Sequence, residues 1–350
     1  MSDRLKCNLT VACCVPKQHK NRESKLKWLD EAMGKTECGM FLTPQEFFGG
    51  TVMMNTDLHM PIEWVKSNCS SLARNHGMIL GVGAATKQES GGATEDYHYF
   101  DSDGSYCGAH TKFALPAYDD VRTKGAGQMW PETKYSRRIK VVEIPSNGMK
   151  IGTLFCWEVF SLTIVPAYTF QGMHLLVHPI KFAPRGWLKM SKPAETGTKN
   201  VIGFDQAPKS QIWCDRLTGI GRHVSICPIA VSCNTWNLGA KYLALCGHVD
   251  EQGSTTDLHE LPSTPEQDFI HTFEITPSRV DALRTALFSA GHFKAIAGDV
   301  NGFSKLKEWT MHSKMQRLEA QLIGGSTRMD CKLLAATAGR QKKKYRLVKR

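Results

Sequence analysis

The sequence predicts a single α/β domain that spans about residues 1–295, followed by a C-terminal extension and a basic tail. Strand-like and helix-like segments alternate along the chain, pairs of strands joined by short turns occupy its middle, and neither a repeat nor a linker interrupts it. Of the 350 residues, 41% are hydrophobic and 22% are charged. This composition is typical of a globular protein and excludes a disordered or collagen-like chain.

The first part of the domain alternates strands with two amphipathic helices. Leu29 and Met33 recur at helical spacing, and Gly34 follows them as a stop signal. Pro61 suits the first turn of a second helix, and Gly77 suits its C-terminal cap. We expect strands at 8–15, 38–42 and 78–85, and helices at 22–33 and 61–76.

The second part of the domain is richer in strands. Turn sequences that contain glycine separate two pairs of strand-like segments, which predicts two hairpins. The hairpins are 97–100 with 106–110 and 140–144 with 150–156; further strands are expected at 174–178, 225–232, 244–249 and 270–275, and a helix from Thr276 to Ser289. An extension at 296–338 contains a possible helix, 303–322, and the tail is 339–350.

Charge and cysteine content limit the class of protein. Residues 340–350 hold seven cations and no acid, and subtracting these seven from the net charge of +11 leaves +4 for the rest. The tail is therefore either a solvated end or a contact for nucleic acid or another polyanion. The twelve cysteines include no CxxC pair, so no metal site is expected. The absence of an export signal or a membrane-length apolar run predicts a cytoplasmic protein without membrane contact.

Three residues have the chemistry of a thiol-dependent active site. Cys156 follows an apolar strand, and Glu46 and Lys112 each lie among apolar residues. A cysteine nucleophile needs a base for its proton and a donor for the oxyanion. A carboxylate in apolar surroundings should have a raised pKa, which suits a base. Taken singly, each residue is better explained without catalysis: Cys156 as a buried structural thiol, Glu46 as an exposed loop acid and Lys112 as a solvated lysine at a strand end.

The segments that carry these residues resemble the signature segments of the nitrilase superfamily, the carbon–nitrogen hydrolases. They are 43–50 (TPQEFFGG), 110–116 (HTKFALP) and 152–158 (GTLFCWE), and a fourth segment, 130–135 (WPETKY), resembles the stretch that carries the family's second glutamate. The resemblance covers about residues 5–290. It implies a nitrilase-like four-layer α-β-β-α sandwich, a homo-oligomer, a small-molecule substrate and no cofactor.

The resemblance also implies roles for individual residues. Glu46 would be the base for Cys156, Lys112 and the backbone N–H of Trp157 would stabilise the oxyanion, and Glu132 would orient Lys112 or the substrate. The order and spacing of the segments are the basis of this assignment.

The substrate is less clearly indicated. The Cys-Trp-Glu turn is similar to nitrile-hydrolysing members, whereas the stretch from Glu132 is similar to amide and N-carbamoyl hydrolases. We favour an amide or N-carbamoyl substrate with release of ammonia or an amine; a nitrile hydrolase and a non-catalytic nitrilase-like binding protein are the alternatives. Lys181, Arg185 and Trp187 follow the strand after the cysteine and are candidates to bind a substrate carboxylate, or else solvated loop cations and a packing tryptophan.

Overall fold

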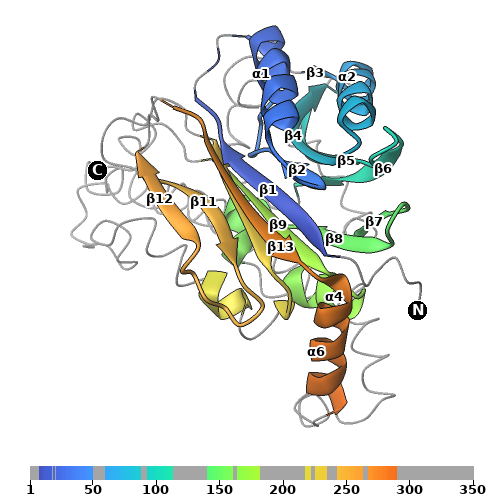
Figure 1. The fold of residues 1–350 in the computed structure, drawn as a ribbon, viewed down its shortest axis with the longest axis vertical. Coiled ribbons are helices and arrows are strands. Elements are labelled where there is room, and N and C mark those ends of the chain that lie inside the picture. The colour runs from blue at the N-terminus through green and yellow to red at the C-terminus, as the bar shows by residue number, and fades with distance from the viewer. Residues whose placement is uncertain are drawn as a thin grey trace, which may run out of the picture.

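The protein contains two β-sheets that face each other, with helices on the outside (Figure 1). The computed structural model describes residues 8–17, 19, 21–49, 60–87, 93–112, 140–160, 164–181, 217–221, 225–234, 243–262 and 267–289. The predicted extension at 296–338, its helix and the tail at 339–350 lie outside these residues.

The first sheet contains seven strands in the order β13-β1-β2-β4-β5-β6, and β3 pairs with β4 at one side. Its centre is parallel, because β1 and β4 both run parallel to β2, whereas β13 is antiparallel to β1 and β4-β5-β6 form an antiparallel meander. The strands are β1 (Leu9–Val15), β2 (Met40–Leu42), β3 (Met60–Pro61), β4 (Ile79–Lys87), β5 (Ala93–Phe100), β6 (Tyr106–Thr111) and β13 (Phe269–Ile275).

The second sheet contains six strands in the order β12-β11-β10-β9-β8-β7. It has the same plan, since β8, β9 and β10 are parallel in the centre and antiparallel strands flank them. The strands are β7 (Val142–Ile144), β8 (Met149–Thr153), β9 (Leu175–Lys181), β10 (Ile229–Asn234), β11 (Leu243–Val249) and β12 (Leu258–Pro262).

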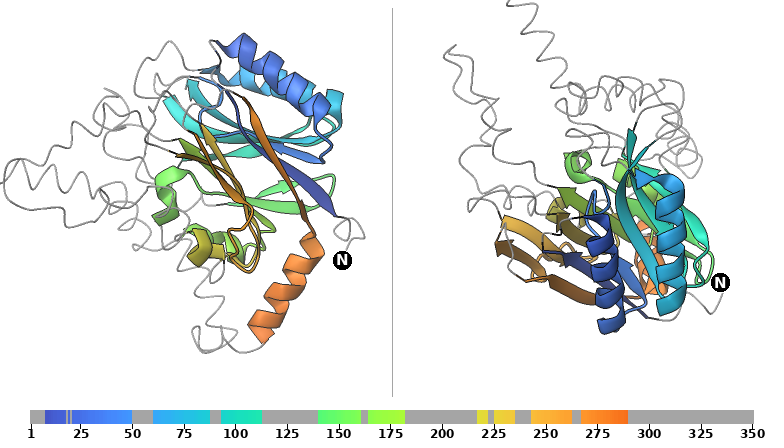
Figure 2. Two further views of the ribbon diagram at one scale, coloured as in Figure 1. Left: turned by 60° about the vertical axis from the view of Figure 1, so that its left-hand side comes forward. Right: turned by 90° about the horizontal axis from the view of Figure 1, so that it is seen from above.

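Helices complete the outer layers. α1 (Arg22–Lys35) and α2 (Ile62–His76) cover the outer face of the first sheet, and α4 (Ile164–Phe170) lies on the side of the second sheet, with α6 (Pro277–Ser289) following β13 (Figures 1 and 2). α1 begins with a capping box, in which Asn21 accepts from the Ser24 N–H at 2.8 Å. α2 ends at Gly77 with a φ of 62°, as the sequence predicts.

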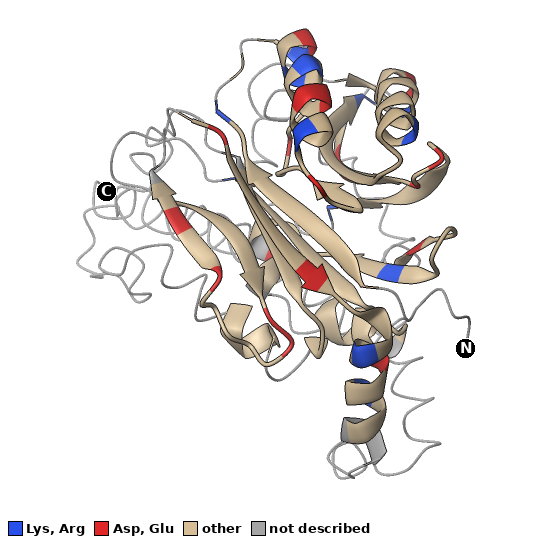
Figure 3. Cartoon of the chain, in the orientation of Figure 1, with Lys and Arg blue, Asp and Glu red and all other residues tan. Residues whose placement is uncertain are grey.

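Alternation along the strands produces two layers of core. In β1, Val11, Cys13 and Val15 pack between the sheets, whereas Ala12 and Cys14 face α1 and α2. This follows from the two-residue period of a strand, which directs neighbouring side chains to opposite faces. Lys, Arg, Asp and Glu are frequent on α1 and α2 and sparse on the facing strands (Figure 3). Buried charges between the layers therefore need a specific explanation.

The strand and helix predictions are largely confirmed, with corrections at four places. The strand before Cys156 ends at Thr153, because a 3₁₀ helix (Cys156–Phe160) begins at the cysteine. β9 extends to Lys181, so this residue ends the strand instead of following it. β10 begins at Ile229, four residues later than expected. The sequence analysis also missed β3, α4 and β12, which are short or lack clear periodicity.

Candidate active site

Glu46 lies in the turn after β2 and is buried, with 2% of its surface exposed. The turn runs directly against β4, where the Phe48 N–H donates to the Gly83 carbonyl at 3.0 Å. A β-carbon at Gly83 would lie only 2.3 Å from the Pro44 carbonyl oxygen, so this approach requires glycine. Glu46 itself has a φ of +50°, which side chains other than glycine rarely adopt. Buried, strained residues of this kind cluster at functional sites.

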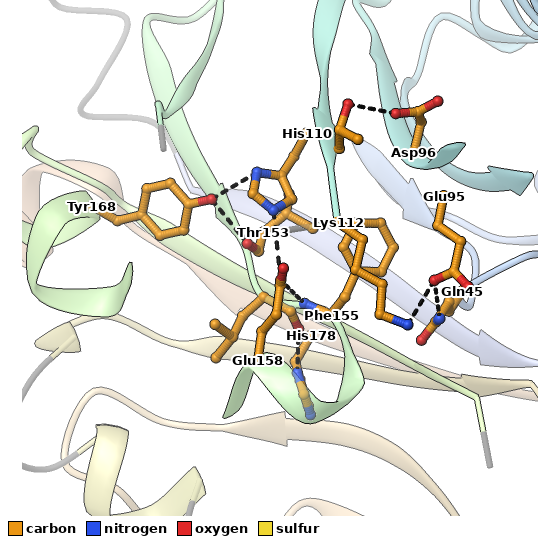
Figure 4. Close-up of polar contacts among 12 residues, drawn as sticks. Gln45, Glu95, Asp96, His110, Lys112, Thr153, Phe155, Glu158, Tyr168 and His178 are labelled. Atoms are coloured by element: carbon orange, nitrogen blue, oxygen red, sulfur yellow. Dashed lines mark hydrogen bonds and ion pairs between the residues drawn. The ribbon is translucent and has the colours of Figure 1, made fainter. Parts of the chain in front are cut away.

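Lys112 follows β6 and is held by the neighbouring strand β5. Its N–H donates to the Glu95 carbonyl at 2.8 Å, and its ammonium lies 2.7 Å from the Glu95 carboxylate. The same carboxylate oxygen accepts from the Gln45 side chain at 2.6 Å, and Gln45 directly precedes Glu46 (Figure 4). All of these side chains are buried. Glu95 thus connects the lysine of the site to the turn that carries the carboxylate.

Cys156 begins the 3₁₀ helix at the end of β8, with 3% of its surface exposed. Glu158 closes the turn around it, because its carboxylate accepts from the Phe155 N–H at 2.8 Å and its own N–H donates to the Phe155 carbonyl at 2.7 Å. Cys156 has a φ of +35°, which is again unusual for a residue with a side chain. The turn therefore presents the thiol in a fixed, strained conformation at the end of a buried strand.

A second polar network contacts the turn at Cys156 through Glu158. His110 Nε2 lies 3.6 Å from the Glu158 carboxylate, and its Nδ1 lies 2.9 Å from the Tyr168 hydroxyl. That hydroxyl also donates to the Thr153 carbonyl at 3.0 Å. Figure 4 shows these side chains converging from β6, β8, α4 and the 3₁₀ helix. Because His110 and Lys112 lie two residues apart, one strand end supports both the thiol turn and the buried lysine.

Lys181 links the thiol to the carboxylate. Its ammonium pairs with the Glu46 carboxylate, and its backbone carbonyl accepts from the Cys156 thiol at 3.6 Å. The side chain is buried, and this burial holds the pKa of Lys181 well below its ordinary value, with a smaller lowering from the Lys25 ammonium. Lys25 is partly buried, this desolvation lowers its pKa to about 8, and it donates to the Phe47 carbonyl at 2.6 Å.

Most other described thiols are in surroundings that disfavour the thiolate. Burial raises the pKa of Cys38 to about 11 and that of Cys227 to about 12, and it also raises the pKa values of Cys14, Cys69 and Cys246.

Within the described part of the chain, no group of three or more His, Cys, Asp or Glu side chains is arranged to hold a metal ion. None of the helices described is both long and apolar enough to cross a membrane.

Comparison with solved structures identifies the fold. The carbon–nitrogen hydrolase from Helicobacter pylori G27 superimposes with a TM-score of 0.61 over 81% of this chain and 94% of its own, at 13% sequence identity. Nit3 from Saccharomyces cerevisiae, a member of branch 10 of the nitrilase superfamily, matches with a TM-score of 0.56 over 82% and 96%, at 15% identity. The chain has the nitrilase fold.

An amidase from Nesterenkonia sp. AN1 also has the nitrilase fold, with a TM-score of 0.55, 14% identity and coverage of 81% of this chain and 99% of its own. At the level of sequence, no protein-family model and no curated protein matches the chain. The structural comparison therefore confirms the predicted nitrilase-like sandwich. At these low sequence identities, the similarity establishes the fold and nothing further.

Within this nitrilase fold, Glu46, Lys112 and Cys156 all lie in one buried network. Lys181 contacts both Glu46 and Cys156. Glu95 connects Lys112 to Gln45, which directly precedes Glu46. The backbone of Trp157 lies in the 3₁₀ helix directly after the cysteine. Glu132, Arg185 and Trp187 lie outside the described residues, so their predicted roles stay predictions.

The sequence analysis missed the role of Glu95, although a signal for it was present. In the β5-β6 hairpin, Asp96 pairs with Thr111. Because the strands are antiparallel, Glu95, which precedes Asp96, lies beside Lys112, which follows Thr111. Extending the predicted hairpin in register would have placed an acid next to Lys112. Lys181 was assigned to a loop because the predicted strand was ended before Pro179, whereas β9 continues through the proline.

Proposed function

We propose that the protein is a thiol-dependent hydrolase of non-peptide carbon–nitrogen bonds, with Cys156 as nucleophile and an amide or N-carbamoyl compound as substrate. The observation that carries the proposal is the turn at Cys156. The Cys156 backbone has a φ of +35°, and its thiol donates to the carbonyl of Lys181. The Lys181 side chain pairs with the buried Glu46 carboxylate. The strand end at Lys181 thus brings together a thiol and a buried carboxylate, the two kinds of group that serve as a cysteine nucleophile and its base.

The proposed reaction has two stages. Glu46 takes the thiol proton, and the thiolate attacks the carbonyl carbon to form a tetrahedral oxyanion, which Lys112 and the Trp157 N–H stabilise. The C–N bond then breaks, the leaving nitrogen takes the proton from Glu46, and a thioester remains on Cys156. Water attacks the thioester with Glu46 again as base, and the carboxylic or carbamic acid leaves as the thiol is restored.

One feature of the site and one structural neighbour favour this chemistry. The ammonium of Lys112 is buried beside Glu95, so its position and charge are set before the oxyanion forms, and little reorganisation is needed. The Nesterenkonia amidase is described with acrylamide added at its active-site cysteine. A protein of this fold that acts on amides through a cysteine supports an amide substrate over a nitrile.

A substrate screen tests the proposal. Released ammonia or amine is measured over primary amides, N-carbamoyl amines and nitriles, with Cys156→Ala and Glu46→Gln as inactive variants and Cys69→Ala, a buried thiol on α2, as the matched control. We expect turnover of amides or N-carbamoyl amines by wild type and Cys69→Ala only, with a thioester adduct on Cys156 detected by intact mass. Turnover by Cys156→Ala at the wild-type rate would refute the assignment of the nucleophile, and turnover of nitriles alone would change the substrate class.

A further inference from the structure

The site contains a second buried cation in addition to the predicted one. Lys181 ends β9 and, like Lys112, is buried. The two lysines are matched with two buried carboxylates, since Lys112 pairs with Glu95 and Lys181 pairs with Glu46. The carboxylate assigned as the base therefore has an ammonium of its own.

The backbone of Lys181 has an independent role in the geometry. Its carbonyl accepts from the Cys156 thiol at 3.6 Å, so a single residue contacts the nucleophile through its main chain and the base through its side chain. β9 fixes this carbonyl, because it runs parallel to β8 on one side and to β10 on the other, where Lys181 is in register with Asn234. The thiol and the carboxylate are thus tied to the same rigid strand end.

We propose that Lys181 is a positioning residue, whose ammonium keeps the Glu46 carboxylate ionised and fixed beside the thiol turn. The inference rests on the proposed function, in which Glu46 is the base, and adds the group that prepares it. Burial alone would favour the protonated carboxylic acid, which cannot accept the thiol proton. An adjacent ammonium opposes this effect. A buried ion pair adds little net stability, so its main consequence is electrostatic.

The electrostatic surroundings of the pair are known from the elements packed around it. Burial and, to a smaller extent, the Lys25 ammonium on α1 lower the pKa of Lys181. The Glu46 carboxylate is the paired charge that favours its ammonium form. The other titratable groups of the described site are Cys156 and Glu158 in the 3₁₀ helix, Glu95, His110 and Lys112 on the β5-β6 side, and His178 three residues before Lys181 on β9.

The test follows alkylation of Cys156 by iodoacetamide as a function of pH, a readout that needs no substrate. Lys181→Met removes the charge at similar length, Lys181→Arg retains it, and Lys66→Met, at a partly exposed lysine on α2, is the matched control. We expect Lys181→Met to move the midpoint of the alkylation profile, and the acidic limb of kcat/KM, upward by about one pH unit or more. Lys181→Arg should restore most of this change, and Lys66→Met should leave the profile unaltered.

A double-mutant cycle keeps the inference testable if the single variants differ in stability. In a Glu46→Gln protein, Lys181→Met should cause no further change in the midpoint, because the carboxylate that the ammonium acts on is absent. A midpoint that is equal in wild type and Lys181→Met would overturn the inference, as would an equal shift in the Glu46→Gln background. If the midpoint shifts but the wild type hydrolyses none of the screened compounds, the pair stands and the proposed function fails.

Discussion

His178 provides a quantitative test of how the interior of the second sheet responds to acid. It lies on β9, is fully buried, and its Nδ1 donates to the carbonyl of Leu154, two residues before Cys156. Burial lowers the pKa of His178 from 6.5 to about 4, although the bond to Leu154 opposes this in part. The folded protein therefore binds this proton more weakly than the unfolded chain does.

The size of the effect follows from the two pKa values. Above pH 6.5 the imidazole is neutral in both states and protonation favours neither. As the pH falls from 6.5 through about 4, the unfolded chain takes up the proton first, so the free energy of unfolding decreases. At about 1.4 kcal/mol for each tenfold change in proton affinity, the loss is about 2 kcal/mol by about pH 5 and about 3 kcal/mol once the pH is below the folded pKa.

Urea denaturation of wild type and His178→Asn at about pH 7.5 and about pH 5 measures this loss. Asparagine does not titrate, and its side-chain N–H₂ can donate to the Leu154 carbonyl in place of Nδ1. The other described histidines with lowered pKa values, His19, His98, His174, His248 and His271, are present in both proteins and cancel in the comparison. We expect wild type to lose about 2 kcal/mol more than the variant between the two pH values. Equal losses in the two proteins would refute the reasoning.

Three further predictions concern the turn at Glu46, the thiol of Cys156 and the tail. Gly83→Ala should destabilise the protein by about 1–3 kcal/mol and reduce activity, because the new carbon displaces the turn at Pro44. Gly219→Ala should change neither stability nor activity, because no described atom lies within 4 Å of the new carbon. Calorimetry measures the stability of the two variants and a turnover assay measures their activity. Brief substoichiometric iodoacetamide should label Cys156 before any other thiol, and mass spectrometry showing equal labelling of a buried cysteine such as Cys69 would contradict this. Deleting residues 340–350 should leave turnover unchanged and abolish salt-sensitive retention on heparin; an unchanged elution salt would eliminate a polyanion contact, and lost activity would show that the tail contributes to the fold or to an oligomer.

The sequence predicted those parts of the fold where periodicity and end signals agree. β1 alternates between two cores, and α2 combines an apolar face with Gly77 at its end, so both were predicted nearly to their limits. The short strand β12, LHELP, has no comparable pattern and was missed. Its place is determined by pairing with β11, which local sequence does not encode.

The site shows the same division between local and long-range information. The segments around Glu46, Lys112 and Cys156 were recognised because each carries its own local pattern. The ion pair between Lys181 and Glu46 joins residues that are 135 positions apart, and no spacing rule connects them. The extended reach of β9 through Pro179 brings this pair together, and proline in a predicted strand ordinarily argues for its end.

The pairing of β1 with β13 constrains the order in which the protein can be assembled. Leu9 lies opposite Ile275, so β1 acquires this neighbour only after the chain has been synthesised through residue 275. Until then, one edge of β1 has unpaired N–H and C=O groups and remains a template for other strands. Nascent chains that stop before residue 269 therefore have an open sheet edge. With this topology, the chain needs protection from aggregation while it is still on the ribosome.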